Sequence, residues 1–166
     1  MRRIFFVLAA VFATAAIAVP AATAVSPHFI SASATLNADG TLTGSFKEAG
    51  LGTNQNIDYT LSANGTATWV CVNKGGANPS AQNKTTVNGP VSASGTFSSG
   101  KNGNVVASLT LSPPPSDISC PKGQTLQLAS ASYTDVAITD TTNGVTEAIP
   151  GTFSTGCLLP DVRGAC

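Results

Sequence analysis

Residues 57–71 read IDYTLSANGTATWVC, and this stretch shows the pattern that decides the fold. Apolar and polar residues alternate over residues 57–63 and again over residues 67–71, as they do in a strand with one buried face. Asn64-Gly65 lies between the two runs, and this dipeptide accepts the positive φ angles of a two-residue hairpin turn. The stretch therefore predicts two antiparallel strands joined by a tight turn.

The same alternation recurs along most of the chain. It slips phase near Leu128, which predicts a β-bulge there. Asp39-Gly40, Asn102-Gly103 and Asn143-Gly144 fall between neighbouring runs and predict three more tight turns. The other strands are expected at residues 30–36, 41–46, 91–97, 105–111, 126–138 and 145–153. The chain is therefore expected to be an all-β protein, an antiparallel, immunoglobulin-like β-sandwich of about eight strands built from four hairpins.

Three longer connections separate the expected hairpins, at residues 48–56, 73–86 and 112–124. Strands that alternate in direction place successive connections at opposite ends of a sheet. The tight turns are therefore expected at one pole, and the long connections with the C-terminal tail at the other. Binding residues are concentrated on long loops, so the long-loop pole is the expected binding surface. Its candidate binding residues are Asn73, Lys74, Lys84 and Lys122.

The four cysteines predict a disulfide framework, since an even number in an exported chain is typical of one. Cys71 ends an expected strand and Cys120 lies in the last long connection, so both belong to the long-loop pole and are expected to pair. Cys157 and Cys166 would then close a short ring at the C-terminus, although four cysteines allow three connectivities. Neither their spacing nor the single histidine, His28, matches a zinc site. No metal and no cofactor are expected.

The N-terminus is typical of a cleavable secretory signal peptide. Arg2 and Arg3 precede an apolar run that ends near Val19, and Ala22-Thr23-Ala24 matches a cleavage site. The run is shorter than a membrane-spanning helix requires. Residues 1–24 are therefore expected to be removed. Residues 25–166 are expected to form a single extracellular domain with a short disulfide-closed tail and no membrane span.

Charge excludes one class of partner. Charged residues make up 10% of the chain, compared with roughly 25% in a typical soluble domain. After removal of Arg2 and Arg3, acidic residues slightly outnumber basic ones. Nucleic-acid binding depends on many contacts from Lys and Arg to phosphate, so no nucleic acid is expected. The expected partner is an extracellular protein, a glycan or a small ligand, bound by a monomer.

Candidate catalytic groups are few. His28 lies close to the expected mature N-terminus, which argues against a nucleophilic site that depends on histidine. Two carboxylate pairs remain as alternatives for glycoside hydrolysis, Asp135 with Asp140 and Glu48 with Asp58. With eight acidic residues in the chain, chance proximity is the better explanation of such pairs.

Residues 45–52 read SFKEAGLG and residues 69–76 read WVCVNKGG. Both segments resemble small exported bacterial β-sandwich proteins of uncharacterised function, a resemblance that implies no particular activity. The composition is also similar to that of neocarzinostatin-type apoproteins. Those proteins place their cysteines in short local rings, whereas Cys71 and Cys120 are far apart, so the similarity implies no ligand pocket. Trp69 is interpreted as packing in the core beside a disulfide rather than as a ligand platform.

The functional expectation is a non-enzymatic, exported binding or interaction module that acts through the long-loop pole. Its first alternative is a structural or cell-surface coat component, which would pack through low-charge faces and exposed edge strands. The third possibility is a small hydrolase or an inhibitor of one.

Overall fold

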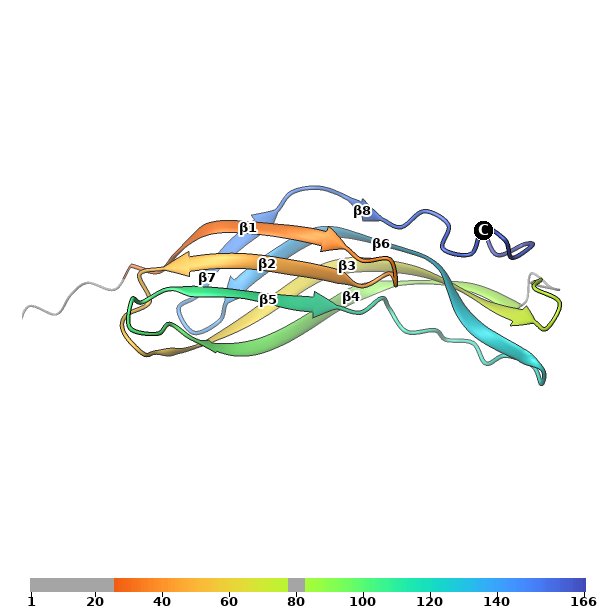
Figure 1. Cartoon of the computed structure of the whole chain (residues 1–166), viewed down its shortest axis with the longest axis horizontal. Coiled ribbons are helices and arrows are strands. Elements are labelled where there is room, and N and C mark those ends of the chain that lie inside the picture. The colour runs from red at the N-terminus through yellow and green to blue at the C-terminus, as the bar shows by residue number, and fades with distance from the viewer. Residues whose placement is uncertain (1–25, 78–82) are drawn as a thin grey trace, which may run out of the picture.

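The computed structural model describes residues 26–77 and 83–166, so the expected signal peptide lies outside the described residues. Its strands form two antiparallel sheets that pack as a β-sandwich (Figure 1). The strands are β1 (His28–Leu36), β2 (Leu42–Ala49), β3 (Asn56–Asn73), β4 (Lys84–Ser98), β5 (Val105–Leu111), β6 (Gln124–Asp140), β7 (Val145–Ile149) and β8 (Phe153–Ser154). The smaller sheet has the order β1-β2-β5; the larger has the order β4-β3-β6-β7, with β8 also paired to β6. The all-β sandwich expected from the alternation is confirmed.

The core lies between the two sheets and is filled by the apolar phase of each strand. Burial alternates along β2, where Leu42 and Phe46 are buried and Ser45 is exposed. Tyr59 and Leu61 of β3 face them from the other sheet and are fully buried. Four rings, those of Phe29, Phe46, Tyr59 and Phe97, pack at centroid distances of 4.5–6.4 Å. Burial of these apolar surfaces is the main stabilising contribution.

The expected turn at Asn64-Gly65 is wrong, because both residues lie in the middle of one continuous strand. β3 runs for 18 residues and pairs with β4 on one side and β6 on the other across this point. The turns at Asp39-Gly40 and Asn143-Gly144 do join hairpin partners, β1 to β2 and β6 to β7. Asn102-Gly103 is also a turn, but it links β4 of the larger sheet to β5 of the smaller one rather than closing a hairpin.

Because the chain does not turn at Asn64-Gly65, it reverses direction one time fewer than expected, and this changes which connections lie at the same end of the molecule. The connection 50–55 lies beside the turn 99–104, where Asn54 N donates to Gly100 O. The turn 141–144 lies beside the start of β3, which follows this connection, because Thr141 N donates to Asp58 O. The expectation that all long connections share a pole is therefore wrong for residues 48–56. The described residues that follow β3 and precede β4, 74–77 and 83, do lie at the opposite end of the molecule, together with the connection 112–123 and the C-terminal tail (Figure 1).

The larger sheet extends far beyond the smaller one, because β3, β4 and β6 are about twice as long as β2 and β5 (Figure 1). Two segments without regular strands cover this extension. The connection 112–123 covers the face that continues the core, where Trp69 is half-buried and its Nε1 donates to Pro114 O at 2.9 Å. The C-terminal tail covers the opposite face, where Val70, Val72 and Ala129 pack against Ala165.

Both expected disulfides are present, Cys71–Cys120 and Cys157–Cys166. The expected bulge near Leu128 is confirmed, since Thr68 pairs with Ser130 and Trp69 with Leu128, which leaves Ala129 as the extra residue. Within the described part of the chain, no helix is long and apolar enough to cross a membrane.

Candidate functional site

The outer face of the larger sheet carries hydroxyl side chains in rows that cross its strands. Thr68 of β3 lies between Thr86 of β4 and Ser130 of β6, and the hydroxyls of Thr68 and Thr86 are hydrogen-bonded at 3.0 Å. The next row places Thr66 between Asn88 and Ser132, with Thr66 Oγ1 donating to Asn88 Oδ1 at 2.8 Å. These rows arise because the polar phase of each strand points outward, and the strand register brings equivalent phases together.

Three depressions follow one another along β3 on this face. The first lies over Thr66 and Thr68 and has a volume of about 460 Å³. The second lies over Ser62 and Asn64, with about 330 Å³, and the third over Asp58 and Thr60, with about 290 Å³. Together, the three depressions extend along β3 from Asp58 to Thr68, a distance of ten residue steps or roughly 33 Å at about 3.3 Å per step. We call this row of depressions the hydroxyl track.

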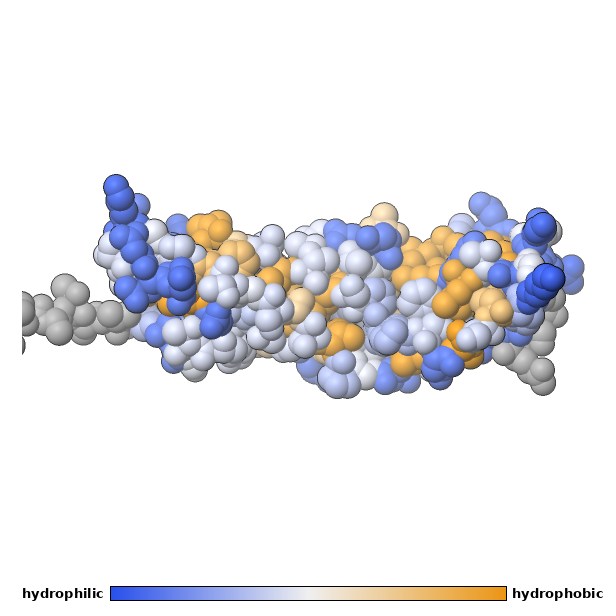
Figure 2. Space-filling model, turned by 90° about the horizontal axis from the view of Figure 1, so that it is seen from below, coloured by the Kyte–Doolittle hydropathy of each residue, from blue (hydrophilic) through white to orange (hydrophobic). Residues whose placement is uncertain are grey.

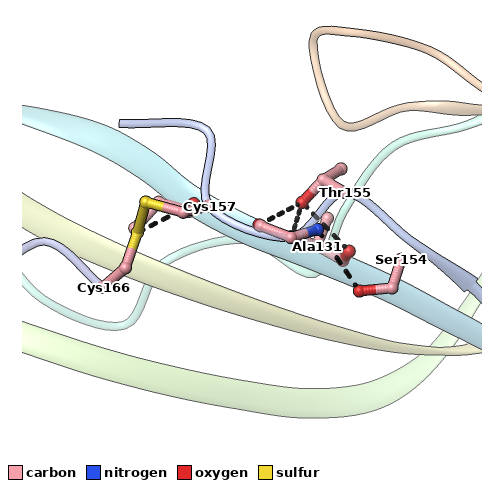
Figure 3. The surroundings of a disulfide bond; sticks show 7 residues. Ala131, Ser154, Thr155, Cys157 and Cys166 are labelled. Atoms are coloured by element: carbon pink, nitrogen blue, oxygen red, sulfur yellow. Dashed lines mark hydrogen bonds between the residues drawn. A yellow bond between two sulfur atoms is a disulfide. The ribbon is translucent and has the colours of Figure 1, made fainter. Parts of the chain in front are cut away.

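Cys157 and Cys166, whose disulfide is drawn in Figure 3, line one side of the first and largest of these three depressions, which we call the groove. Thr155 anchors the tail to β6: its N donates to Ala131 O at 2.9 Å, and its Oγ1 accepts from Ala131 N at 3.0 Å. The Cys157–Cys166 disulfide then closes the ring, and the buried Ala165 fixes it on the sheet. The groove is lined by Thr66, Thr68, Lys84, Thr86, Ser130, Ala131, Ser132, Ser154, Gly156, Cys157, Ala165 and Cys166.

The four binding residues expected from the sequence have different environments. Lys84 lines the groove. Lys74 and Lys122 are exposed at the same end of the molecule, but neither lines the groove. Asn73 shapes the turn after β3, since its Oδ1 accepts from the backbone N of Gly75 at 2.9 Å and of Ala77 at 3.1 Å. Only one of the four, Lys84, therefore belongs to the candidate site.

The hydroxyl residues of the groove were not among the expected binding residues. Their signal in the sequence is the polar phase of the alternation, and Thr66, Thr68, Thr86 and Ser130 all belong to it. That phase contains many more hydroxyls along the chain. Only the strand register selects the ones that meet beside the C-terminal ring.

The two carboxylate pairs considered for glycoside hydrolysis do not form. Asp58 is exposed on the outer face and its Oδ1 accepts from Thr96 Oγ1, whereas Glu48 is fully buried between the sheets. Asp135 is exposed at a bulge of β6 and Asp140 is fully buried at its end. The structure instead brings one member of each pair together, because Glu48 and Asp140 are close enough to interact. Both side chains are fully buried, so neither carboxyl group is open to a substrate at the surface.

Asp135 has a backbone φ of 52°, which is uncommon for a residue other than glycine. Its Oδ2 accepts from Asn64 Nδ2 at 2.9 Å, across the middle of the hydroxyl track. Aspartate tolerates this conformation better than most residues do. Asn64, expected in a turn, thus fixes the carboxylate of Asp135 on the outer face.

Within residues 26–77 and 83–166, no group of three or more His, Cys, Asp and Glu side chains is placed to hold a metal ion. Comparison of the chain with protein-family models, with curated proteins and with solved structures finds no match.

Proposed function

We propose that the protein is an exported, non-enzymatic binding module that holds an uncharged, hydroxyl-rich polymer, an extracellular glycan chain, along the hydroxyl track. The observation that carries this proposal is the alignment of three depressions along one strand, with a fixed wall beside the largest. An aligned set of shallow sites fits an extended ligand better than a compact one. The Cys157–Cys166 ring holds the wall in place before any ligand binds.

The chemistry of the track matches a neutral ligand. Each Ser or Thr hydroxyl can donate one hydrogen bond and accept others, as a sugar hydroxyl does. The charged residues that line the three depressions are only Lys84, Asp58 and Asp135. A track with so few charges provides no strong attraction for a polyanion. On the side of the molecule seen from below in Figure 2, strongly hydrophilic residues also gather mainly at the two ends, and weakly polar and apolar residues lie between them.

Affinity should depend on ligand length. A hydrogen bond that replaces one to water contributes only about 1 kcal/mol, and no exposed aromatic ring lines the described depressions to add stacking. A short oligosaccharide that fills the groove alone should therefore bind weakly. A chain long enough to reach Asp58 should bind much more tightly.

The test is retention on insoluble neutral polysaccharides, followed by titration with neutral oligosaccharides of increasing length. Thr68→Val with Thr86→Val removes a hydroxyl pair from the groove. The matched control is Thr43→Val with Thr110→Val, a pair bonded at the same 3.0 Å on the outer face of the smaller sheet. We expect the first variant to lose at least tenfold in affinity and the control to retain it. Equal effects of the two variants, or no retention of the wild type, would contradict the proposal.

The edge of the larger sheet favours a second candidate function, a self-assembling coat component. β4 is a 15-residue edge strand whose only charged residue is Lys84. Long edges with few charges tend to pair with other chains. Pro90 lies near its middle and has no N–H to donate, which weakens such pairing. Size-exclusion chromatography at increasing concentration distinguishes the two functions, since the binding module should remain a monomer.

Export is part of the same proposal and is supported by the sequence of residues 1–24 and by the two disulfides. Cleavage after Ala24 would make Val25 the first residue of the extracellular form. N-terminal sequencing of protein recovered from the medium checks this start.

A further inference from the structure

Three polar side chains meet inside the sandwich, far from the groove. Glu48 belongs to the buried phase of β2, and Tyr59 and Asp140 are direct partners across β3 and β6. The accessible surface of each of the three residues is 0%. Aromatic rings of Phe46 and Phe97 pack around Tyr59. We call this group the buried acid cluster.

The two carboxyl groups of the cluster have different partners. Asp140 accepts two hydrogen bonds from Asn143: Oδ1 from the backbone N at 2.9 Å and Oδ2 from Nδ2 at 2.7 Å. This arrangement suits an ionised carboxylate, which only accepts. Both oxygens of Glu48 and the hydroxyl of Tyr59, in contrast, have no partner in hydrogen-bonding geometry among the described residues. An ionised Glu48 would therefore be buried without compensation, which is costly.

Burial is the main reason that the pKa of Glu48 is raised above its ordinary value. The Tyr59 hydroxyl opposes this effect, the neighbouring Asp140 carboxyl adds to it, and the coulombic interaction with His28 opposes it. Burial and the same two carboxyl groups raise the pKa of the Tyr59 hydroxyl as well. β1 thus contributes His28, β3 Tyr59 and β6 Asp140 to the surroundings of Glu48. The side chains from β4 and β5 at this level, Phe97 and Val105, are apolar.

We propose that the buried acid cluster is a proton-controlled latch, in which Glu48 carries a proton beside the Asp140 carboxylate and its loss loosens this end of the sandwich. Glu48 stands one residue before the end of β2, where the chain enters the connection 50–55. Asp140 is the last residue of β6 and holds the turn that follows it. Two negative charges in the cluster would repel each other in a medium that screens them poorly. The ends of two facing strands would then be pushed apart.

The direction of the pH dependence follows from the raised pKa of Glu48. A carboxyl group that binds its proton more tightly in the folded state stabilises that state at low pH. Its contribution is complete below the ordinary value of 4.5 and is lost as the pH rises through the pKa of the folded protein. The latch is therefore closed in acid and weakened towards neutral and alkaline pH.

The experiment measures thermal unfolding from pH 4 to pH 9 for the wild type, Glu48→Gln and the control Asp58→Asn, which changes an exposed carboxylate. Glu48→Gln keeps the shape of the protonated acid without its titration. We expect its melting temperature to match that of the wild type at pH 4 and to exceed it by several degrees at pH 9. Hydrogen exchange of residues 50–55 should accelerate with pH beyond the intrinsic rate in the wild type only. Asp58→Asn should keep the pH profile of the wild type.

A second measurement does not depend on the variant. The carboxyl carbon of Glu48, followed by NMR in the wild type, should titrate above the ordinary value of 4.5. A titration at the ordinary value, or a Glu48→Gln profile parallel to that of the wild type, would overturn the proposal. Saturable stabilisation of the wild type by added Ca²⁺, lost in Glu48→Gln, would overturn it in favour of a cation site.

Discussion

Gly65 of β3 lies directly against Pro114 of the connection that follows β5. A Cβ atom at position 65 would lie 2.9 Å from Pro114 Cδ and 3.0 Å from Pro114 Cγ, closer than side chains normally approach. The backbone of Gly65 is extended and paired on both sides, so the glycine is not required for a turn. Its role is to allow the connection 112–123 to reach the sheet, where it carries Cys120 to Cys71.

Gly65→Ala should therefore destabilise the protein by about 1–3 kcal/mol, the usual cost of overpacking. Gly89 is the ideal control, because it is the direct cross-strand partner of Gly65 and has open space where its Cβ would be. Gly89→Ala should be neutral or stabilise by about 0.5 kcal/mol, since alanine reduces the entropy of the unfolded chain. Chemical denaturation of the two variants measures the difference. Equal losses would show that strand glycines matter here for a reason other than contact with Pro114.

The two disulfides should differ in their contributions to stability. Cys71 and Cys120 are separated by 49 residues and Cys157 and Cys166 by 9. In the loop-entropy model, these separations correspond to about 4 and about 3 kcal/mol. Thermal melts of Cys71→Ser with Cys120→Ser, and of Cys157→Ser with Cys166→Ser, should show the larger loss in the first variant. A larger loss in the second would mean that the C-terminal ring supports the sheet more than its size suggests.

Two buried tyrosines should respond in opposite ways to loss of their hydroxyls. Tyr133 Oη donates to Gly40 O at 2.7 Å, a buried bond that ties β6 to the turn between β1 and β2. Tyr133→Phe leaves that carbonyl without this donor and should cost about 1–3 kcal/mol. The Tyr59 hydroxyl has no partner in hydrogen-bonding geometry among the described residues, so Tyr59→Phe should cost nothing or stabilise the protein. Denaturation at pH 4, below the ordinary pKa of 4.5 that Glu48 exceeds, makes the comparison. A similar loss in both variants would contradict this difference.

Much of the fold follows from local patterns. Alternation with period two predicts the strands because the side chains of a strand point to opposite faces in turn. The turns predicted at Asp39-Gly40 and Asn143-Gly144 do form, and their glycines adopt the positive φ angles that the prediction assumed, 86° for Gly40 and 73° for Gly144. The same alternation also indicates that Glu48 is buried, because Glu48 follows Leu42 and Phe46 in the buried phase of β2.

The amino-acid sequence alone thus indicated most of the strands and turns and favoured the observed pairing of the cysteines, since each depends on the residues near it or on a simple order along the chain. Only the tertiary structure decided whether a glycine serves a turn or allows close packing. Gly65 and Gly40 both follow a residue typical of turns, but only the position of Pro114 shows that Gly65 serves close packing. It also decided that Thr68 meets Thr86 and that Glu48 meets Asp140. Those meetings depend on strand register and on the packing of one sheet against the other, which no local pattern of residues contains.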